Sequence, residues 1–139
     1  MRLHLLSAAE LPTIVPLAQE LNPGIDKAVV DARAREMFTY AHYLCFGCKI
    51  DDRLIGISSG WLTTRLYSGK QLELDNVVIT HAERGRGRGI AFLTLIEAWA
   101  KDRGCDSVEL NTYVTNSRSH KLYHTLGYRI LGFHFQKQI

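Results

Sequence analysis

Hydrophobic and polar positions divide the chain into segments with the period of a strand and segments with the period of a helix. From Asp26 to about Ala41, apolar residues recur at spacings of four, three and four, which places them on one face of a helix. From Ile90 to Arg103 most residues are apolar, and Thr94, Glu97 and Lys101 form one narrow polar stripe, so this helix is expected to be mostly buried. The strand-like segments are Arg2 to Leu6, Tyr43 to Ile50, Leu54 to Leu66, Gln71 to Thr80, Ser107 to Val114 and Tyr128 to Gln136.

Capping and turn residues separate these segments. Ser7 and Glu10 have the spacing of a capping box, so a further helix is expected to start there, with its first turns disturbed by two prolines. Asn116 can cap a short helix before the last strand, and Gly127 can end it. The remaining breaks are turns at Asn22-Pro23-Gly24, Asp51-Asp52 and Ser68-Gly69-Lys70.

The order of the elements predicts a single α/β domain. The short polar connection at Asp51-Asp52 joins two strands as an antiparallel hairpin. Val77, Val78 and Ile79 form a continuous apolar run, which is typical of a strand covered on both faces. The helix and strand that follow this run make a right-handed crossover, with a ligand expected at the carboxyl end of the first strand.

Composition narrows the class of protein. A chain of 139 residues with 46% hydrophobic and 22% charged residues is long enough for one domain with a real core. The net charge is only +3, and the arginines at 84, 86 and 88 account for the excess, which favours a local site for an anionic ligand over a polycationic surface. No apolar run reaches the ~20 residues of a membrane span, and no signal peptide is recognisable.

The cysteines favour a reducing compartment. Three cysteines cannot all pair within one chain, and Cys45 and Cys48 have no second Cys or His pair at zinc spacing. We therefore expect buried reduced thiols, no metal site and a cytoplasmic location.

The run Arg84-Gly85-Arg86-Gly87-Arg88-Gly89 lies between a buried strand and a buried helix. Glycines allow a ligand to approach the backbone, and the first N–H groups of a helix have no internal partner and attract anions. Arginines add charge and paired donors for phosphate. The loop is therefore a candidate cradle for a pyrophosphate.

Three other interpretations of this loop fit less well. It lacks the Gly-Lys-Ser/Thr ending of a nucleoside triphosphate loop. It also differs from a dinucleotide-binding loop, because it follows strands that come late in the chain. Such a loop has an acidic residue about 20 positions further on, and Glu109, near that position, falls inside a predicted strand. Arginine-glycine tracts that bind nucleic acid are usually disordered, whereas this one joins two strongly apolar elements, so no nucleic-acid partner is expected.

A resemblance to a known family rests on two motifs about 30 residues apart. The apolar run followed by Arg84-x-x-Gly87-x-Gly89 and a helix resembles the acetyl-CoA signature of the GNAT N-acetyltransferase superfamily. The segment from Asn116 to Tyr128, with Tyr123 and Leu126-Gly127-Tyr128, resembles the next element of that family. The C-terminal run also resembles the branch that includes aminoalkylphosphonate acetyltransferases.

The resemblance implies an α/β (α+β) domain with a central mixed, mostly antiparallel sheet flanked by helices on both faces. Residues 1–70 would form the variable, acceptor-side half, and residues 71–139 the acetyl-CoA-binding half. The acceptor pocket would be formed by Ile25 to Tyr43 and the segment Trp61 to Gln71. The cofactor-binding residues would be Val77, Val78, Ile79, Arg84, Gly85, Arg86, Gly87, Arg88, Gly89, Ile90 and Asn116.

The chemistry needs a proton donor and a base. Tyr123 is the candidate that gives a proton or hydrogen bond to the departing thiolate, with a packing role as its alternative. Glu73 and Asp75 point to the same side of one strand, and either could take the amine proton directly or through a water. Asp75 is favoured slightly, because the family often has an acid just before the apolar run. His120 could orient Tyr123 or be a surface residue.

The expected function is acetyl-CoA-dependent transfer of an acetyl group directly to a primary amine of a small molecule. The alternatives are a protein or peptide N-acetyltransferase and a non-catalytic acyl-CoA-binding module. A homodimer is a further expectation from the family, and the acceptor itself is left open.

Overall fold

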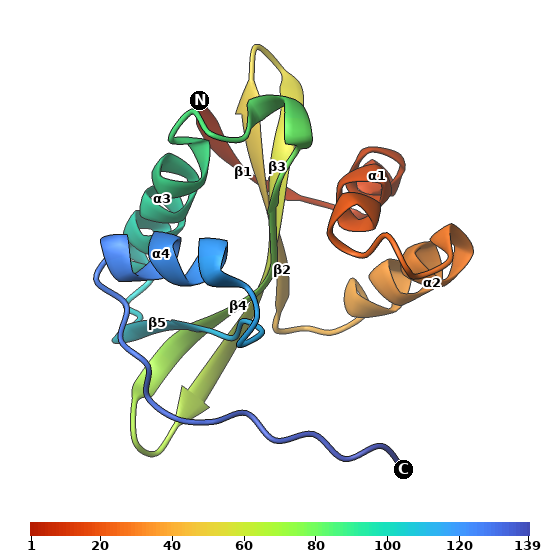
Figure 1. The fold of residues 1–139 in the computed structure, drawn as a ribbon. Coiled ribbons are helices and arrows are strands. Elements are labelled where there is room, and N and C mark those ends of the chain that lie inside the picture. The colour runs from red at the N-terminus through yellow and green to blue at the C-terminus, as the bar shows by residue number, and fades with distance from the viewer.

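The computed structural model describes all residues from 1 to 139, in one α/β domain. Its centre is a five-stranded sheet in the order β1-β2-β3-β4-β5 (Figure 1). Neighbouring strands are antiparallel except β4 and β5, which are parallel, so the mixed, mostly antiparallel sheet is confirmed. The strands are β1 (Arg2–Leu6), β2 (Tyr43–Ile50), β3 (Arg53–Arg65), β4 (Gly69–Ile79) and β5 (Ser107–Leu110).

Helices cover both faces of the sheet, as expected from the resemblance. Figure 1 shows α1 and α2 on one side and α3 and α4 on the other. None of the helices combines the length and the apolar character that a bilayer span requires. The helical elements are η1 (Ala8–Glu10), α1 (Leu11–Leu21), α2 (Lys27–Met37), η2 (His81–Glu83), α3 (Arg88–Asp102) and α4 (Ser117–Thr125).

Adjacent residues of β4 enter different hydrophobic layers. Val78 packs with residues of α1, whereas Ile79 packs with Phe92, Leu93 and other residues of α3. This confirms that the apolar run is covered on both faces, since side chains alternate along a strand. In β2, the same alternation separates Cys45 from Cys48, which lie in opposite layers, and all three cysteines are free.

The predicted turn and capping residues behave as expected. Asp51 and Asp52 both have positive φ, at 47° and 63°, which is the conformation of a two-residue hairpin turn with the right twist. The Ser7 N–H donates to Glu10 Oε2 at 2.9 Å, and a short 3-10 turn precedes α1. The side chain of Asn116 accepts a hydrogen bond from the Ser119 N–H at 3.2 Å and so caps α4.

Two predicted elements are shorter than expected, and one predicted strand is absent. The helix predicted to reach Ala41 ends at Met37, because the chain turns there through bonds from Thr39 N–H to Glu36 O and from Tyr40 N–H to Met37 O. The strand predicted to reach Val114 ends at Leu110, where its pairing with β4 stops. The strand predicted over Tyr128 to Gln136 is absent, since that segment pairs with no other strand of the chain.

A bulge in β4 ends the pairing of β4 with β5. Ile57 pairs with Val78 and Ser59 with Asp75, so β4 has one extra residue between these two pairs. Asn76, within this extra stretch, has a φ of +51°. The parallel pairing with β5 covers only Gln71 to Leu74. Bulges bend a strand and increase its twist, so β4 separates from β5 beyond this point.

Candidate active site

The open edge of β4 lies directly after the bulge. Thr80 N–H donates to Ile55 O on β3 at 2.8 Å, and Val78 O also faces β3. Because successive peptide groups of a strand point to opposite edges, the N–H of Ile79 points away from β3, where β5 no longer pairs. An extended ligand can add to such an edge as a further strand does.

The glycine-rich loop continues from this edge. Gly85 and Gly87 have φ of +78° and +73°, which only glycine adopts without strain, and a Cβ at either position would meet no atom within 4 Å. Gly87 precedes the first residue of α3, and its carbonyl accepts the Ala91 N–H at 3.1 Å. The N–H groups of residues 88–90 therefore have no partner within the helix and form an anion site at its positive end.

The three arginines of the loop are held by the protein itself. Arg84 Nε donates to Ile79 O at 2.7 Å, and its Nη2 lies 3.5 Å from Glu20 Oε2. Arg86 Nη1 and Arg88 Nε each lie 3.6 Å from Glu83 Oε2. These contacts hold the arginine side chains near carboxylates of the protein, and the backbone N–H groups of the helix start are free donors.

Glu83 is the centre of this ion-pair cluster, and sequence reasoning missed it. Arg53, in the β2–β3 hairpin, donates from Nη2 to Glu83 Oε1 at 2.7 Å. This hydrogen bond holds the pKa of Glu83 below its usual range, although burial opposes that shift. The residue is only 7% exposed. A carboxylate directly before the arginine run is visible in the sequence, but its partner in the hairpin is not.

Helix α4 lies beside the start of α3. A Cβ at Gly89 would lie 3.6 Å from the Leu122 side chain, so the small residue allows close packing of the two helices. Tyr123 follows Leu122, is half-buried and packs against the core on the α3 side. The predicted cofactor loop and the helix that carries the predicted proton donor are thus neighbours, although they are more than 20 residues apart in the sequence. The ring of His120 bonds to Tyr113 O at 3.0 Å.

The environment of Tyr123 keeps its phenol protonated. Burial raises its pKa above the usual value, an interaction with Ser119 lowers it, and the charge of Asp75 raises it again. The ring packs edge-on against Tyr128, with centroids 5.9 Å apart.

Asp75 sits at the bulge and is exposed. Its two carboxylate oxygens accept from the backbone and side-chain N–H groups of Asn76, at 2.8 and 3.2 Å. The Asn76 side chain also donates to Ser59 Oγ at 3.2 Å, and the hydroxyl of Tyr43 lies 3.2 Å from the same atom. Burial is the main cause of the raised pKa of Tyr43.

Glu73 has different surroundings from Asp75. Arg65 Nη2 lies 3.4 Å from Glu73 Oε2, and Asn111 Nδ2 donates to Oε1 at 3.4 Å. The strand register aligns Glu73 with Trp61 of β3 and, through it, with Tyr43 of β2. The rings of Tyr43 and Trp61 have centroids 5.0 Å apart, so an aromatic pair lies beside the two carboxylates.

Tyr43 and Trp61 enter the sequence predictions only as end residues of the two predicted acceptor segments. Their alignment in one row across the sheet depends on strand register, which the sequence does not reveal. A cavity of about 510 Å³ does lie within those segments, lined by His42, Leu62, Thr63, Thr64 and Lys70.

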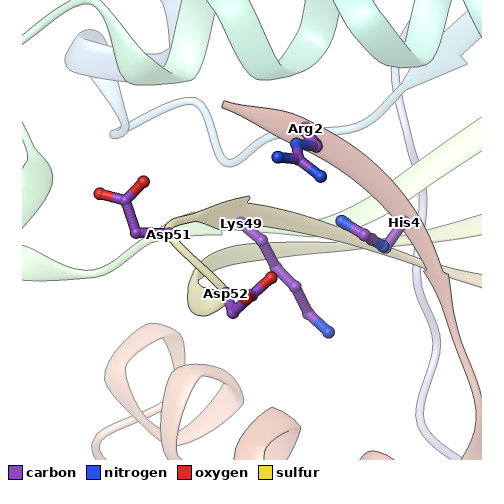
Figure 2. A pocket seen from close by; sticks show the side chains of 5 residues that line it. All are labelled: Arg2, His4, Lys49, Asp51 and Asp52. Carbon is purple, nitrogen blue, oxygen red and sulfur yellow. The ribbon is translucent and has the colours of Figure 1, made fainter.

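A second hollow, of about 310 Å³, lies elsewhere on the domain (Figure 2). Arg2 and His4 of β1, Lys49 of β2 and the two aspartates of the hairpin turn line it, without any apolar side chain. Lys49 Nζ lies 3.4 Å from Glu10 Oε1. None of the predicted site residues contributes to this hollow.

His, Cys, Asp and Glu side chains form no cluster anywhere in the chain that could hold a metal ion.

Comparison with known proteins gives one curated relative of interest and several similar folds. Streptothricin acetyltransferase from Escherichia coli is 25% identical over 91 residues, which cover 63% of this chain and 48% of the relative. The chain thus spans about half the length of this curated relative.

Two solved structures share the fold at low identity. A ribosomal-protein-alanine N-acetyltransferase from Brucella melitensis biovar Abortus 2308 has a TM-score of 0.83 at 17% identity, over 99% of this chain and 98% of the other. The aminoglycoside N-acetyltransferase AAC(6')-Iy in complex with CoA has a TM-score of 0.83 at 18% identity, over 99% and 93% of the two chains.

The family model described as "Acetyltransferase (GNAT) family" matches residues 13–128. This match includes most of α1, the whole of β4, the glycine-rich loop and α4, and it agrees with the enzyme class and the acetyl donor expected from the two sequence motifs. By the extent of this match, the chain belongs to the GNAT acetyltransferase family.

Proposed function

We propose that this chain is an acetyl-CoA-dependent N-acetyltransferase that moves an acetyl group directly to a primary amine of a small molecule. One observation carries the proposal. The open edge of β4 leads into the free N–H groups at the start of α3, and α4, which carries Tyr123, packs against that start through Leu122.

The residues present fit the cofactor. The N–H groups of residues 88–90 would hold the diphosphate, and the glycines at 85 and 87 keep the approach clear. The open edge at Val77 to Ile79 would pair with the pantetheine arm. Asn116, which caps α4, is proposed as a further contact. When bound, acetyl-CoA supplies an acetyl group activated as a thioester.

Tyr123 is proposed as the proton donor to the departing sulfur. A tyrosine phenol is neutral at pH 7, and burial raises the pKa of Tyr123 further, so it has a proton or hydrogen bond to give. A free thiol has a pKa of about 8.5, and its departure as a thiolate is eased by such a donor. The outward N–H of Ile79 is a candidate donor to the developing oxyanion.

Asp75 is proposed as the base, directly or through a water, with Glu73 as the alternative. A primary amine with a pKa of about 10.4 must lose a proton before it can attack. Asp75 is exposed and bonds only to Asn76, whereas Glu73 lies near the side chains of Arg65 and Asn111. Because its oxygens already have these partners, the Glu73 carboxylate is better suited to hold a cationic amine than to exchange protons.

The acceptor is proposed to bind on the side of Tyr43, Trp61 and Glu73, where an aromatic wall meets carboxylates. Such walls attract cations as well as apolar groups.

The division into an acceptor-side half, 1–70, and a cofactor half, 71–139, is part of this proposal. The aminoalkylphosphonate-like branch and the cytoplasmic location also remain predictions.

A CoA-release assay over a panel of acceptors tests the proposal. The panel contains aminoglycosides, aminoalkylphosphonates, polyamines, and peptides with free N-termini or lysines. We expect release of CoA with at least one free amine. Turnover on peptides alone would support the protein-acetyltransferase alternative, and acetyl-CoA binding without turnover on any acceptor would support the non-catalytic module.

A further inference from the structure

The carboxylate of Asp75, the proposed base, is held by a single residue. Its Oδ1 accepts from the backbone N–H of Asn76 at 2.8 Å, and its Oδ2 accepts from Asn76 Nδ2 at 3.2 Å. An ionised carboxylate has about four lone-pair sites, and these two bonds use one site on each oxygen. The other sites remain free to take a proton from an acceptor amine.

The side chain of Asn76 is fixed in turn by a buried hydroxyl. Asn76 Nδ2 also donates to Ser59 Oγ at 3.2 Å, so the two hydrogens of the amide serve two acceptors. Ser59, on β3, is only 5% exposed, and the phenol oxygen of Tyr43 on β2 lies 3.2 Å from the same Oγ. The reverse orientation of the amide would place its oxygen against the Asp75 carboxylate, where two acceptors repel each other. The hydrogen bonds therefore connect the interior of the sheet to Asp75.

The backbone at this position does not by itself call for an asparagine. Asn76 lies in the bulge of β4 with a φ of +51°. Glycine adopts such a conformation more readily than asparagine does. The bulge therefore does not explain the amide group, whereas its hydrogen bonds to Asp75 and Ser59 do.

We propose that Asn76 is a positioning residue that sets the orientation of the Asp75 carboxylate toward the acceptor amine. A base acts only within hydrogen-bond reach of the proton that it removes. Asp75 is exposed, and without the Asn76 side chain its carboxylate would be free to change rotamer in solvent. This inference rests on the proposed function and adds to it the residue that prepares the base.

A double-mutant cycle between positions 75 and 76 tests the proposal. Asn76→Gly keeps the positive φ accessible and removes only the amide side chain. We expect it to lower kcat about tenfold or more, because small misplacements of a reacting group are costly. The dissociation constant for acetyl-CoA should stay within about twofold, since the bulge is retained. In the Asp75→Asn background, the same substitution should change kcat by less than about twofold, because the carboxylate to be positioned is gone.

Ser59→Ala tests the same role without touching the backbone of the bulge. It removes the anchor of the Asn76 amide, and we expect about a threefold loss of kcat in the parent and no loss in the Asp75→Asn background. Asp52→Gly is the matched control. Asp52 also has a positive φ, at 63°, and lines the second hollow, to which no predicted site residue contributes, so this variant should keep the kcat of the parent.

The outcomes separate this proposal from the proposed function. An unchanged kcat in Asn76→Gly, or an equal loss of kcat in both backgrounds, would overturn the positioning role and leave acetyl transfer intact. If Asp75→Asn keeps the kcat of the parent, Asp75 is not the base, and its positioning fails with it. Absence of CoA release with every acceptor of the panel would overturn the proposed function itself.

Discussion

Arg53 Nη2 donates to Glu83 Oε1 at 2.7 Å and so joins the β2–β3 hairpin to the segment that precedes the cofactor loop. Glu83 Oε2 lies 3.6 Å from the arginines at 86 and 88 in the same loop. One almost buried carboxylate therefore interacts with three guanidiniums and holds the loop against the β2–β3 hairpin. The proposed diphosphate cradle rests on this anchor.

Glu83→Gln is expected to lower thermal stability and to weaken acetyl-CoA binding, because the loop loses its central anion. Thermal unfolding and calorimetric titration measure the two effects. Arg35→Gln, which breaks the exposed Arg35–Asp31 pair on α2, is the matched control and should change neither quantity appreciably. Equal effects of both substitutions would contradict the anchoring role.

The same residue gives a pH dependence with a definite sign. The pKa of Glu83 is lowered in the folded protein, so its contribution to stability is present above the ordinary carboxyl pKa of about 4.3 and is lost as pH falls through the lower folded value. The parent should therefore lose more stability than Glu83→Gln between pH 6 and pH 3. Parallel stability curves of the two proteins over this range would count against the lowered pKa.

Tyr123→Phe is expected to lower kcat by about 10²–10³, because the sulfur loses its proton donor. The dissociation constant for acetyl-CoA should stay within about twofold, since the ring and its packing remain. Steady-state CoA release and calorimetric titration separate the two quantities. Tyr113→Phe removes a hydroxyl from a ring that is 85% exposed, and it should behave as the parent.

Gly87→Ala tests the backbone of the cradle. With φ at +73°, an alanine costs about 1–2 kcal/mol, although the added methyl group meets no atom. We expect this cost in urea unfolding, together with a higher KM for acetyl-CoA. Gly24→Ala is the control, because Gly24 also has open space but lacks the positive φ, and it should change the KM little.

Asp75→Asn and Glu73→Gln separate the roles of the two carboxylates. If Asp75 is the base, Asp75→Asn lowers kcat by about 10² or more with little change in the KM for the amine. Glu73→Gln should mainly raise the KM for the amine, because it removes a binding charge. Measurements of kcat and KM with the best amine of the panel decide between them, and the opposite pattern would assign the base to Glu73.

Local patterns in the sequence were sufficient for most elements. The hairpin at Asp51-Asp52, the cap at Asn116 and the two-faced run of β4 depend on near neighbours, and the structure confirms all three. The last predicted strand shows the limit of this reasoning. Residues 128–136 have the alternation of a strand, but a strand forms only where another backbone completes its hydrogen bonds.

The sequence by itself therefore determined the family, the order of the elements and the position of the glycine-rich loop, because these depend on residue type and short spacing. Only the tertiary structure decided that Tyr43, Trp61 and Glu73 form one row across the sheet. It also decided that the loop arginines pair with Glu20 and Glu83. The close packing of Gly89 against Leu122 is a third relationship of this kind. These relationships join residues of different elements. They are set by strand register, by the bulge at Asn76 and by helix packing, none of which a local pattern specifies.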